Sequence, residues 1–155
     1  MGPNPTDRAK NGVKRSLLVE KDGGPLAVVI AGANVPDHQL LAATLDAVVV
    51  ERPEPETEYP QHLCLDKGYD NETGWGACVD RDYIPHIQLI RDLRPPHKEG
   101  HRPRRWVVER TLAWLSKCRA ILVRWDKKAC NYLGLLKLAC ALLWYRRQRR
   151  LVALR

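Results

Sequence analysis

The stretch Arg102–Lys117 reads R-P-R-R-W-V-V-E-R-T-L-A-W-L-S-K and consists mainly of basic and apolar residues. Its apolar residues recur with a helical period around most of the circumference, so we expect a largely buried helix. Arg110 and Lys117 mark its solvated edge. Glu109 is the single carboxylate, at the border of the apolar surface, where an acid seldom sits without a partner or a metal ion. An ion pair with Arg105, one turn earlier, is the simpler interpretation.

Charge divides the sequence into two unlike halves. The chain has 155 residues, which fits one domain with a real core. Its net charge of +8 combines 10 basic and 15 acidic residues in 1–96 with 16 basic and 3 acidic residues in 97–155. The basic half favours a polyanion partner, with nucleic acid ahead of an anionic membrane surface. A charge run can also be only a solvated face.

Cysteine use and hydropathy bear on the compartment. The five cysteines are odd in number and form no C-x-x-C motif. We expect reduced, mostly buried thiols in a cytoplasmic protein. No apolar signal stretch opens the sequence, and the most apolar run, 133–145, is shorter than the ~20 residues that span a bilayer.

Turn residues organise the first third of the chain. Residues 1–12 contain two prolines and two glycines, and we expect a loop there. The runs 14–20 and 25–32 are rich in β-formers and flank Asp22-Gly23, which predicts a hairpin with its turn at that dipeptide.

A helix and a connector are predicted next. Asp37 is a suitable N-cap for a helix that reaches Val48 or Val49 with a 3.6-residue apolar period. Residues 51–60 hold three prolines and four glutamates, and therefore predict an exposed acidic connector.

A second notable carboxylate follows a short apolar run. Residues 62–65 predict a strand that ends at Asp66, and Asp70 or Asn71 would cap a helix over 72–79. Open α/β sheets bind ligands at the carboxyl ends of their strands, which makes Asp66 a candidate site residue. A turn-forming role for Asp66 is the open alternative.

The next segment offers no strong site. Residues 83–87 predict an edge strand, because Pro85 removes one donor from the ladder. His97 and His101 stand four residues apart, but the surrounding prolines and glycine favour solvated histidines over a zinc site.

The C-terminal region is predicted to be helical. After a turn or short extended piece at 120–125, an apolar stripe predicts a helix from about Cys130 to Arg146. The arginine-rich run 146–150 is either a phosphate-contacting segment or a plain solvated terminus.

Three stretches together carry a family resemblance. They are K-R-S-L-L-V-E-K-D-G-G-P-L (14–26), L-D-K-G-Y-D (65–70), and R-W-V-V-E-R-T-L-A-W-L (105–115) with its sequel R-W-D-K-K-A-C-N-Y-L-G-L-L-K-L-A (124–139). In this order and spacing they resemble the DDE transposases of bacterial insertion sequences, of the IS-five/IS-four type. The resemblance implies an α/β, ribonuclease-H-like fold with a mixed sheet flanked by helices.

The resemblance also implies a metal site. In that family the second acidic residue follows a strand and the third lies on a helix within an R-x3-E core, which corresponds to Asp66 and to Arg105 with Glu109. Asp66 and Glu109 would then be catalytic ligands of Mg²⁺ or Mn²⁺, ions that prefer hard oxygen donors. Two such ions about 4 Å apart activate a water or a 3′-hydroxyl for in-line attack and stabilise the leaving oxygen.

The basic residues near these acids are the candidate DNA contacts. They are Arg102, Arg105, Arg110, Lys117 and, with less support, Lys67. The family pattern has Tyr three residues before the Arg and Lys seven residues after the Glu. This chain has Arg102 and Ser116 at those positions, with Lys117 one place late.

The first acid of the family has no counterpart here. It lies on the first strand of the family's core, and neither Asp7 nor the hairpin acids Glu20 and Asp22 replace it. We therefore expect a partial catalytic domain, truncated before that strand, with a sheet-containing acidic half at 13–96 and a basic helical half at 97–155.

The predicted function is DNA transposition, through metal-dependent cleavage and strand transfer at the ends of an insertion sequence. The partners would be transposon-end and target DNA, together with the missing N-terminal half or an intact transposase, in the nucleoid. The chain is expected to be inactive alone. The alternative is a non-catalytic DNA-binding remnant or an inhibitor of intact transposase. An RNA-binding protein is disfavoured, because the aromatic residues fall on apolar helical faces and not on a strand platform.

Overall fold

A computed structural model of the chain describes residues 1–87 and 106–153. Its first part is an antiparallel sheet of β1 (Gly2–Pro3), β2 (Asn11–Val19) and β3 (Pro25–Gly32), in the order β1-β2-β3. The predicted hairpin is confirmed, and Gly23 makes its turn with a φ of +91°. The loop predicted at 1–12 is partly wrong, because Gly2 pairs with Gly12 and closes the segment into a second, shorter hairpin.

A second sheet follows, made of two parallel strands. β4 (Gln61–Leu65) pairs with β5 (Tyr83–Ile87), and the crossover between them contains the 3₁₀ helix η1 (Lys67–Tyr69) and α2 (Glu72–Val79). Parallel strands need such a crossover. The structure confirms Asn71 as the cap of α2, since its side chain accepts a 2.9 Å hydrogen bond from the N–H of Gly74.

The helix α1 (Asp37–Asp46) packs against β2 and β3 and also contacts α2. Asp37 was predicted as its N-cap, which is wrong. Pro36 is the cap, and Asp37 is the first helical residue, where its charge favours the positive end of the helix. Val48 and Val49 lie beyond the last turn, and residues 51–60 form the predicted connector without regular structure.

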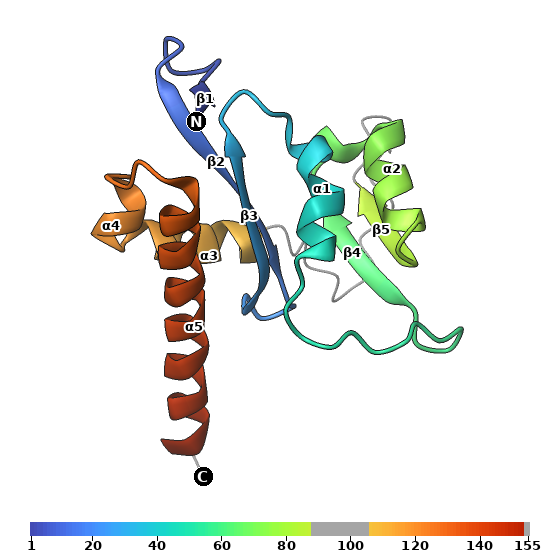
Figure 1. Cartoon of the computed structure of the whole chain (residues 1–155). Coiled ribbons are helices and arrows are strands. Elements are labelled where there is room, and N and C mark those ends of the chain that lie inside the picture. Colours follow the sequence, from blue (N-terminus) through green and yellow to red (C-terminus); the bar gives the residue numbers. More distant parts are fainter. Residues whose placement is uncertain (88–105, 154–155) are drawn as a thin grey trace.

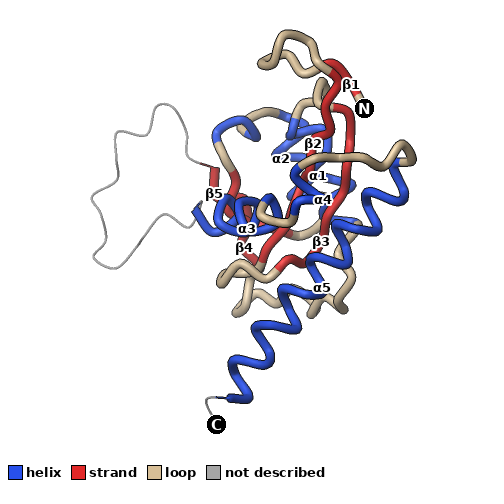
Figure 2. The backbone as a smooth tube through the Cα atoms, turned by 90° about the vertical axis from the view of Figure 1, so that its left-hand side faces the viewer, coloured by secondary structure: helices blue, strands red, loops and turns tan. Residues whose placement is uncertain are grey.

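Three helices form the C-terminal part: α3 (Trp106–Ser116), α4 (Arg119–Leu122) and α5 (Ala129–Ala153). α3 packs on β2 and α5 packs on β3, so these helices cover the hairpin on the side opposite α1 (Figure 1). The turn or extended piece expected at 120–125 is only partly confirmed, because α4 takes up residues 120–122, with Ile121 buried in the core, and residues 123–125 follow without helix. α5 continues past the predicted end, and its last turns extend beyond the body of the molecule (Figures 1 and 2).

Two hydrophobic cores hold these layers. The first joins the hairpin to the C-terminal helices, with Leu115 and Leu136 fully buried. The second joins α1 and α2 to the parallel strands, through Leu41, Leu63 and Cys78 among others. The fold is therefore a mixed α/β structure, as the sequence indicated.

The cysteines are all free thiols, as expected, but only Cys78 and Cys140 are buried. The expectation of mostly buried thiols is wrong because Cys64 lies on the uncovered face of β4 and Cys130 lies in the exposed first turn of α5. No helix in the described ranges is long and apolar enough to cross a membrane.

Candidate active site

Asp66 directly follows the strand β4, as predicted, and that strand buries Leu63 and Leu65 on one face. Its side chain is exposed, and its Oδ1 accepts a 2.6 Å hydrogen bond from the N–H of Lys67. Asp66 thus caps η1, which confirms the turn-forming role left open above. That role keeps the carboxylate at the carboxyl end of a strand and at the surface, a position compatible with ligand binding.

A partly buried tyrosine and a second acid lie near Asp66. Burial, followed by the negative charges of Asp37 and Asp66, raises the pKa of Tyr69 to about 12. The Tyr69 phenol therefore stays protonated at neutral pH and remains a hydrogen-bond donor. Lys14 Nζ lies 3.1 Å from Asp37 Oδ2 and offsets part of the local negative charge. This neighbourhood could not be predicted from the sequence, because Asp37 and Asp66 approach the tyrosine only through tertiary packing.

Glu109 lies in the first turn of α3, and its side chain is exposed. The expectation of a largely buried helix is wrong: α3 buries only Val107, Thr111 and Leu115, which share the face that packs on β2. Glu109 stands about 200° around the helix from Val107 and Thr111, away from the hairpin. In the described ranges Glu109 has no hydrogen bond or ion pair. Its predicted partner Arg105 lies outside those ranges.

The hairpin turn fixes α3 in place. Thr111 Oγ1 donates a 2.8 Å hydrogen bond to the carbonyl of Gly23, and Arg110 Nη2 donates one of 2.5 Å to the carbonyl of Asp22. The guanidinium of Arg110 also lies 4.6 Å from the centre of the Trp106 ring. These contacts set the rotation of α3 about its axis, and so determine the side on which Glu109 projects.

Asp66 and Glu109 belong to elements of different hydrophobic cores. Asp66 follows β4, which packs in the core with α1 and α2, whereas Glu109 lies on α3, which packs in the core of the hairpin and the C-terminal helices. Across residues 1–87 and 106–153, no three His, Cys, Asp or Glu side chains lie close enough together to hold a metal ion. The structure therefore places neither acid in a complete three-ligand group.

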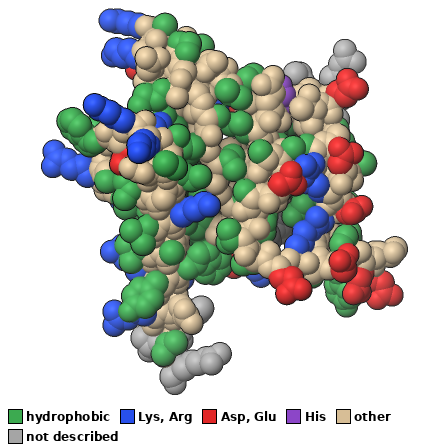
Figure 3. Space-filling view, in the orientation of Figure 1, with side chains coloured by type: hydrophobic (Ala, Val, Ile, Leu, Met, Phe, Trp, Pro, Cys, Tyr) green, Lys and Arg blue, Asp and Glu red, His purple; other side chains and the backbone are tan. Residues whose placement is uncertain are grey.

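The surface charge follows the division seen in the sequence (Figure 3). Basic side chains gather over α4, α5 and the loop between β1 and β2, and acidic ones over the side of α1, α2 and the connector before β4. Lys67 and Lys117 are exposed, as expected for DNA contacts. Arg110 is exposed as well, but its guanidinium is bonded to the hairpin. Arg102 and Arg105 lie outside the described residues.

Glu20 was predicted only as an acid of the hairpin, and the hydrogen bonds of its side chain were not predicted. Its carboxylate accepts hydrogen bonds of 2.7 Å from the N–H groups of Asp22 and Gly24 and one of 2.8 Å from Arg147 Nη1. Burial raises the pKa of Glu20, but these three hydrogen bonds and the Arg147 charge outweigh burial and leave the pKa below its ordinary value. An acid two residues before an Asp-Gly turn was the available signal.

Comparison with known proteins gives two matches. Residues 2–144 match the family model described as a transposase DDE domain. The chain is also 38% identical, over 151 residues, to a Burkholderia cepacia protein that carries the name of a transposase for insertion sequence element IS402. That alignment covers 96% of this chain and 70% of the relative. No solved structure matches the chain significantly.

Proposed function

The chain belongs to the DDE transposases of bacterial insertion sequences, and from this premise we propose that it supplies part of a ribonuclease-H-like catalytic domain, with Asp66 and Glu109 as two of its metal ligands. The family acts in DNA transposition and uses divalent metal ions. The observation that carries the proposal is the placement of the two acids: both are exposed, one at the carboxyl end of a parallel strand and one in the first turn of a helix in the basic half.

The donor chemistry of these residues fits Mg²⁺ or Mn²⁺, because carboxylate oxygens are the hard ligands that such ions prefer. When bound, the ions activate the attacking water or 3′-hydroxyl and stabilise the leaving oxygen during cleavage and strand transfer. Lys67 lies next to Asp66, where it would neutralise a phosphate brought to the metal ions. Asp66 and Glu109 are two ligands, and a complete site requires at least one more.

We place the third ligand on a strand that inserts between the two sheets. In the described part of the chain, β2 beyond Gly12 pairs only with β3, and β4 pairs only with β5. Leu18 of β2 nevertheless packs against the core that contains Leu63 and Leu65 of β4. A strand paired with both open edges would join the sheets into one mixed sheet, and the first aspartate of the family would enter on it. Alone, the chain would then be inactive.

DNA would approach over the basic half. Arg102, Arg105, Arg110 and Lys117 of this half, together with Lys67 beside Asp66, are the proposed phosphate contacts. The affinity for DNA should fall steeply with salt, since each neutralised phosphate releases a counterion. An affinity independent of salt concentration would exclude the basic surface as the DNA-binding face.

Strand cleavage provides the direct test of the two acids. The chain is assayed with transposon-end duplexes and Mg²⁺, alone and joined to an upstream segment that supplies the aspartate-bearing strand. We expect cleavage only for the joined protein, and we expect Asp66→Ala and Glu109→Ala each to abolish it while DNA affinity stays close to that of the parent.

Glu72→Ala is the matched control, because Glu72 is another exposed acid in the same half as Asp66 and is not a proposed ligand. It should retain cleavage. Cleavage by Asp66→Ala or Glu109→Ala would contradict the assignment of that residue. DNA binding without cleavage by the joined protein would instead support the alternative, a non-catalytic DNA-binding remnant or an inhibitor of intact transposase.

A further inference from the structure

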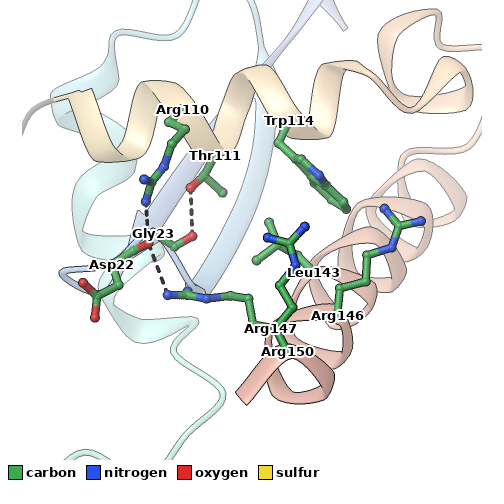
Figure 4. A pocket seen from close by; sticks show the side chains of 9 residues that line it. All are labelled: Asp22, Gly23, Arg110, Thr111, Trp114, Leu143, Arg146, Arg147 and Arg150. Carbon is green, nitrogen blue, oxygen red and sulfur yellow. Dashed lines mark hydrogen bonds between the residues drawn. The ribbon is translucent and has the colours of Figure 1, made fainter. Parts of the chain in front are cut away.

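A groove of about 410 Å³ runs between the hairpin turn, α3 and the last turns of α5 (Figure 4). Four arginines line it: Arg110, Arg146, Arg147 and Arg150. Trp114 forms part of the wall between α3 and α5. Neither Asp66 nor Glu109 lines the groove, so it is a separate feature from the proposed metal ligands.

Two of these arginines are occupied by the hairpin. Arg110 is bonded to the carbonyl of Asp22, and Arg147 donates to Glu20 Oε1 at 2.8 Å and to the carbonyl of Asp22 at 3.2 Å. Their role is to hold the turn against the helices. They nevertheless keep their positive charge at the edge of the groove.

The other two arginines have no such partner. In the described ranges, Arg146 and Arg150 form no hydrogen bond or ion pair, and both are exposed. The guanidinium of Arg146 lies 5.7 Å from the centre of the Trp114 ring, a contact that orients it without neutralising it. The carboxylate of Asp22 points away from Arg146 and Arg150 (Figure 4). The groove therefore carries uncompensated positive charge.

The spacing of the two arginines suits a nucleic-acid backbone. Arg146 and Arg150 are four residues apart on one face of α5, which corresponds to about 6 Å along the helix axis. Every second phosphate of one DNA strand lies about 7 Å apart along the duplex axis. A guanidinium can bind a phosphate through two parallel hydrogen bonds, which an ammonium cannot do.

We propose that Arg146 and Arg150, with Trp114 orienting Arg146, form a second phosphate site that binds the backbone of double-stranded DNA along α5. This inference rests on the proposed transposase function and extends it: the DNA would continue past the metal ligands and be held at the end of α5. It also assigns a role to the arginine-rich run 146–150, for which the sequence left two interpretations open.

The test measures the affinity of the whole chain for a mixed-sequence DNA duplex by fluorescence anisotropy, in EDTA so that no metal chemistry contributes. The variant R146A/R150A is compared with K137A/R149A, which removes the same charge from exposed positions of the same helix outside the groove. Alanine favours helix in both variants. Between about 50 and 200 mM salt, R146A/R150A should reduce the slope of log K against log salt by about 2, and the control by much less.

A third variant separates geometry from charge. R146K/R150K keeps both charges, so we expect a nearly unchanged slope and a weaker affinity, because lysine lacks the planar fork of arginine. Equal losses in R146A/R150A and K137A/R149A would overturn the inference while leaving the proposed function standing. Competition by polyglutamate as effective as that of the duplex would overturn it too, in favour of an acidic protein partner. Absence of DNA binding by the parent chain would refute this inference and the proposed basic DNA-binding face, whereas the assignment of Asp66 and Glu109 is tested separately by the cleavage assay on the joined protein.

Discussion

Replacing Gly23 by alanine tests whether the hairpin turn holds α3 and its acid in place. Gly23 is buried and adopts a φ of +91°, a conformation that side chains of L-residues rarely adopt. A Cβ built at this position would lie 3.0 Å from Thr111 Oγ1 and 2.8 Å from Arg110 Nη2. The Arg110 side chain can move aside, but Thr111 is fixed in the buried face of α3.

Two costs add up for this substitution. The positive φ costs an alanine about 1–2 kcal/mol. Displacing Thr111 weakens its hydrogen bond to the Gly23 carbonyl, and losing such a bond costs on the order of 1 kcal/mol. Losing the hydrogen bond from Arg110 to the Asp22 carbonyl would add a similar cost. We therefore expect Gly23→Ala to lower the free energy of unfolding by about 2–4 kcal/mol.

Urea unfolding followed by circular dichroism measures this change. With an m-value of about 1–3 kcal/mol per molar urea, the midpoint should fall by roughly 1 M or more. Gly134→Ala is the matched control, because Gly134 lies inside α5 and an added Cβ would meet no atom within 4 Å. That substitution should stabilise the protein by about 0.5–1 kcal/mol. Equal midpoints for Gly23→Ala and the parent would refute the proposed role of the turn.

Two further changes test the core and the hairpin. Leu136→Ala leaves a cavity at a fully buried position and should lower the free energy of unfolding by about 2–5 kcal/mol, measured by urea unfolding. The control Leu138→Ala, on the exposed side of α5, should change it by less than about 0.5 kcal/mol. The lowered pKa of Glu20 contributes stability above its ordinary pKa of 4.5, and this contribution is lost as the pH falls through the folded-state value. Glu20→Gln should therefore make the free energy of unfolding fall less steeply as the pH is lowered into the acid range. An unchanged pH dependence would exclude Glu20 as a source of this acid sensitivity.

Local signals in the sequence were enough for several elements. Asp22-Gly23 between two β-rich runs fixed the hairpin, and Asn71 before a short apolar segment fixed the start of α2. Pro85 correctly marked an edge strand. Each of these depends on a few neighbouring residues, so the sequence alone contains the necessary information.

Features that depend on distant segments escaped prediction. The apolar period of α3 gave a helix, but only the packing of α3 on β2 shows that a single face is buried and that Glu109 is exposed. Similarly, the groove exists because Trp114 meets Arg146 and Arg147 meets Glu20, and these pairs are far apart in the chain. Asp66 and Glu109 were singled out from the sequence, and their role as metal ligands stays a prediction.

Because β2 and β4 each have an open edge, formation of one continuous sheet and formation of the proposed metal site depend on each other. Asp66 follows β4 and Glu109 lies on the helix that packs on β2, and within the described ranges no backbone hydrogen bonds join these two strands. Their relative position therefore depends on side-chain packing around α1. A strand paired with both edges would replace this packing with two hydrogen-bonded ladders and would bring the third carboxylate in the same step. Under the proposed function, completing the sheet and completing the metal site are then a single event.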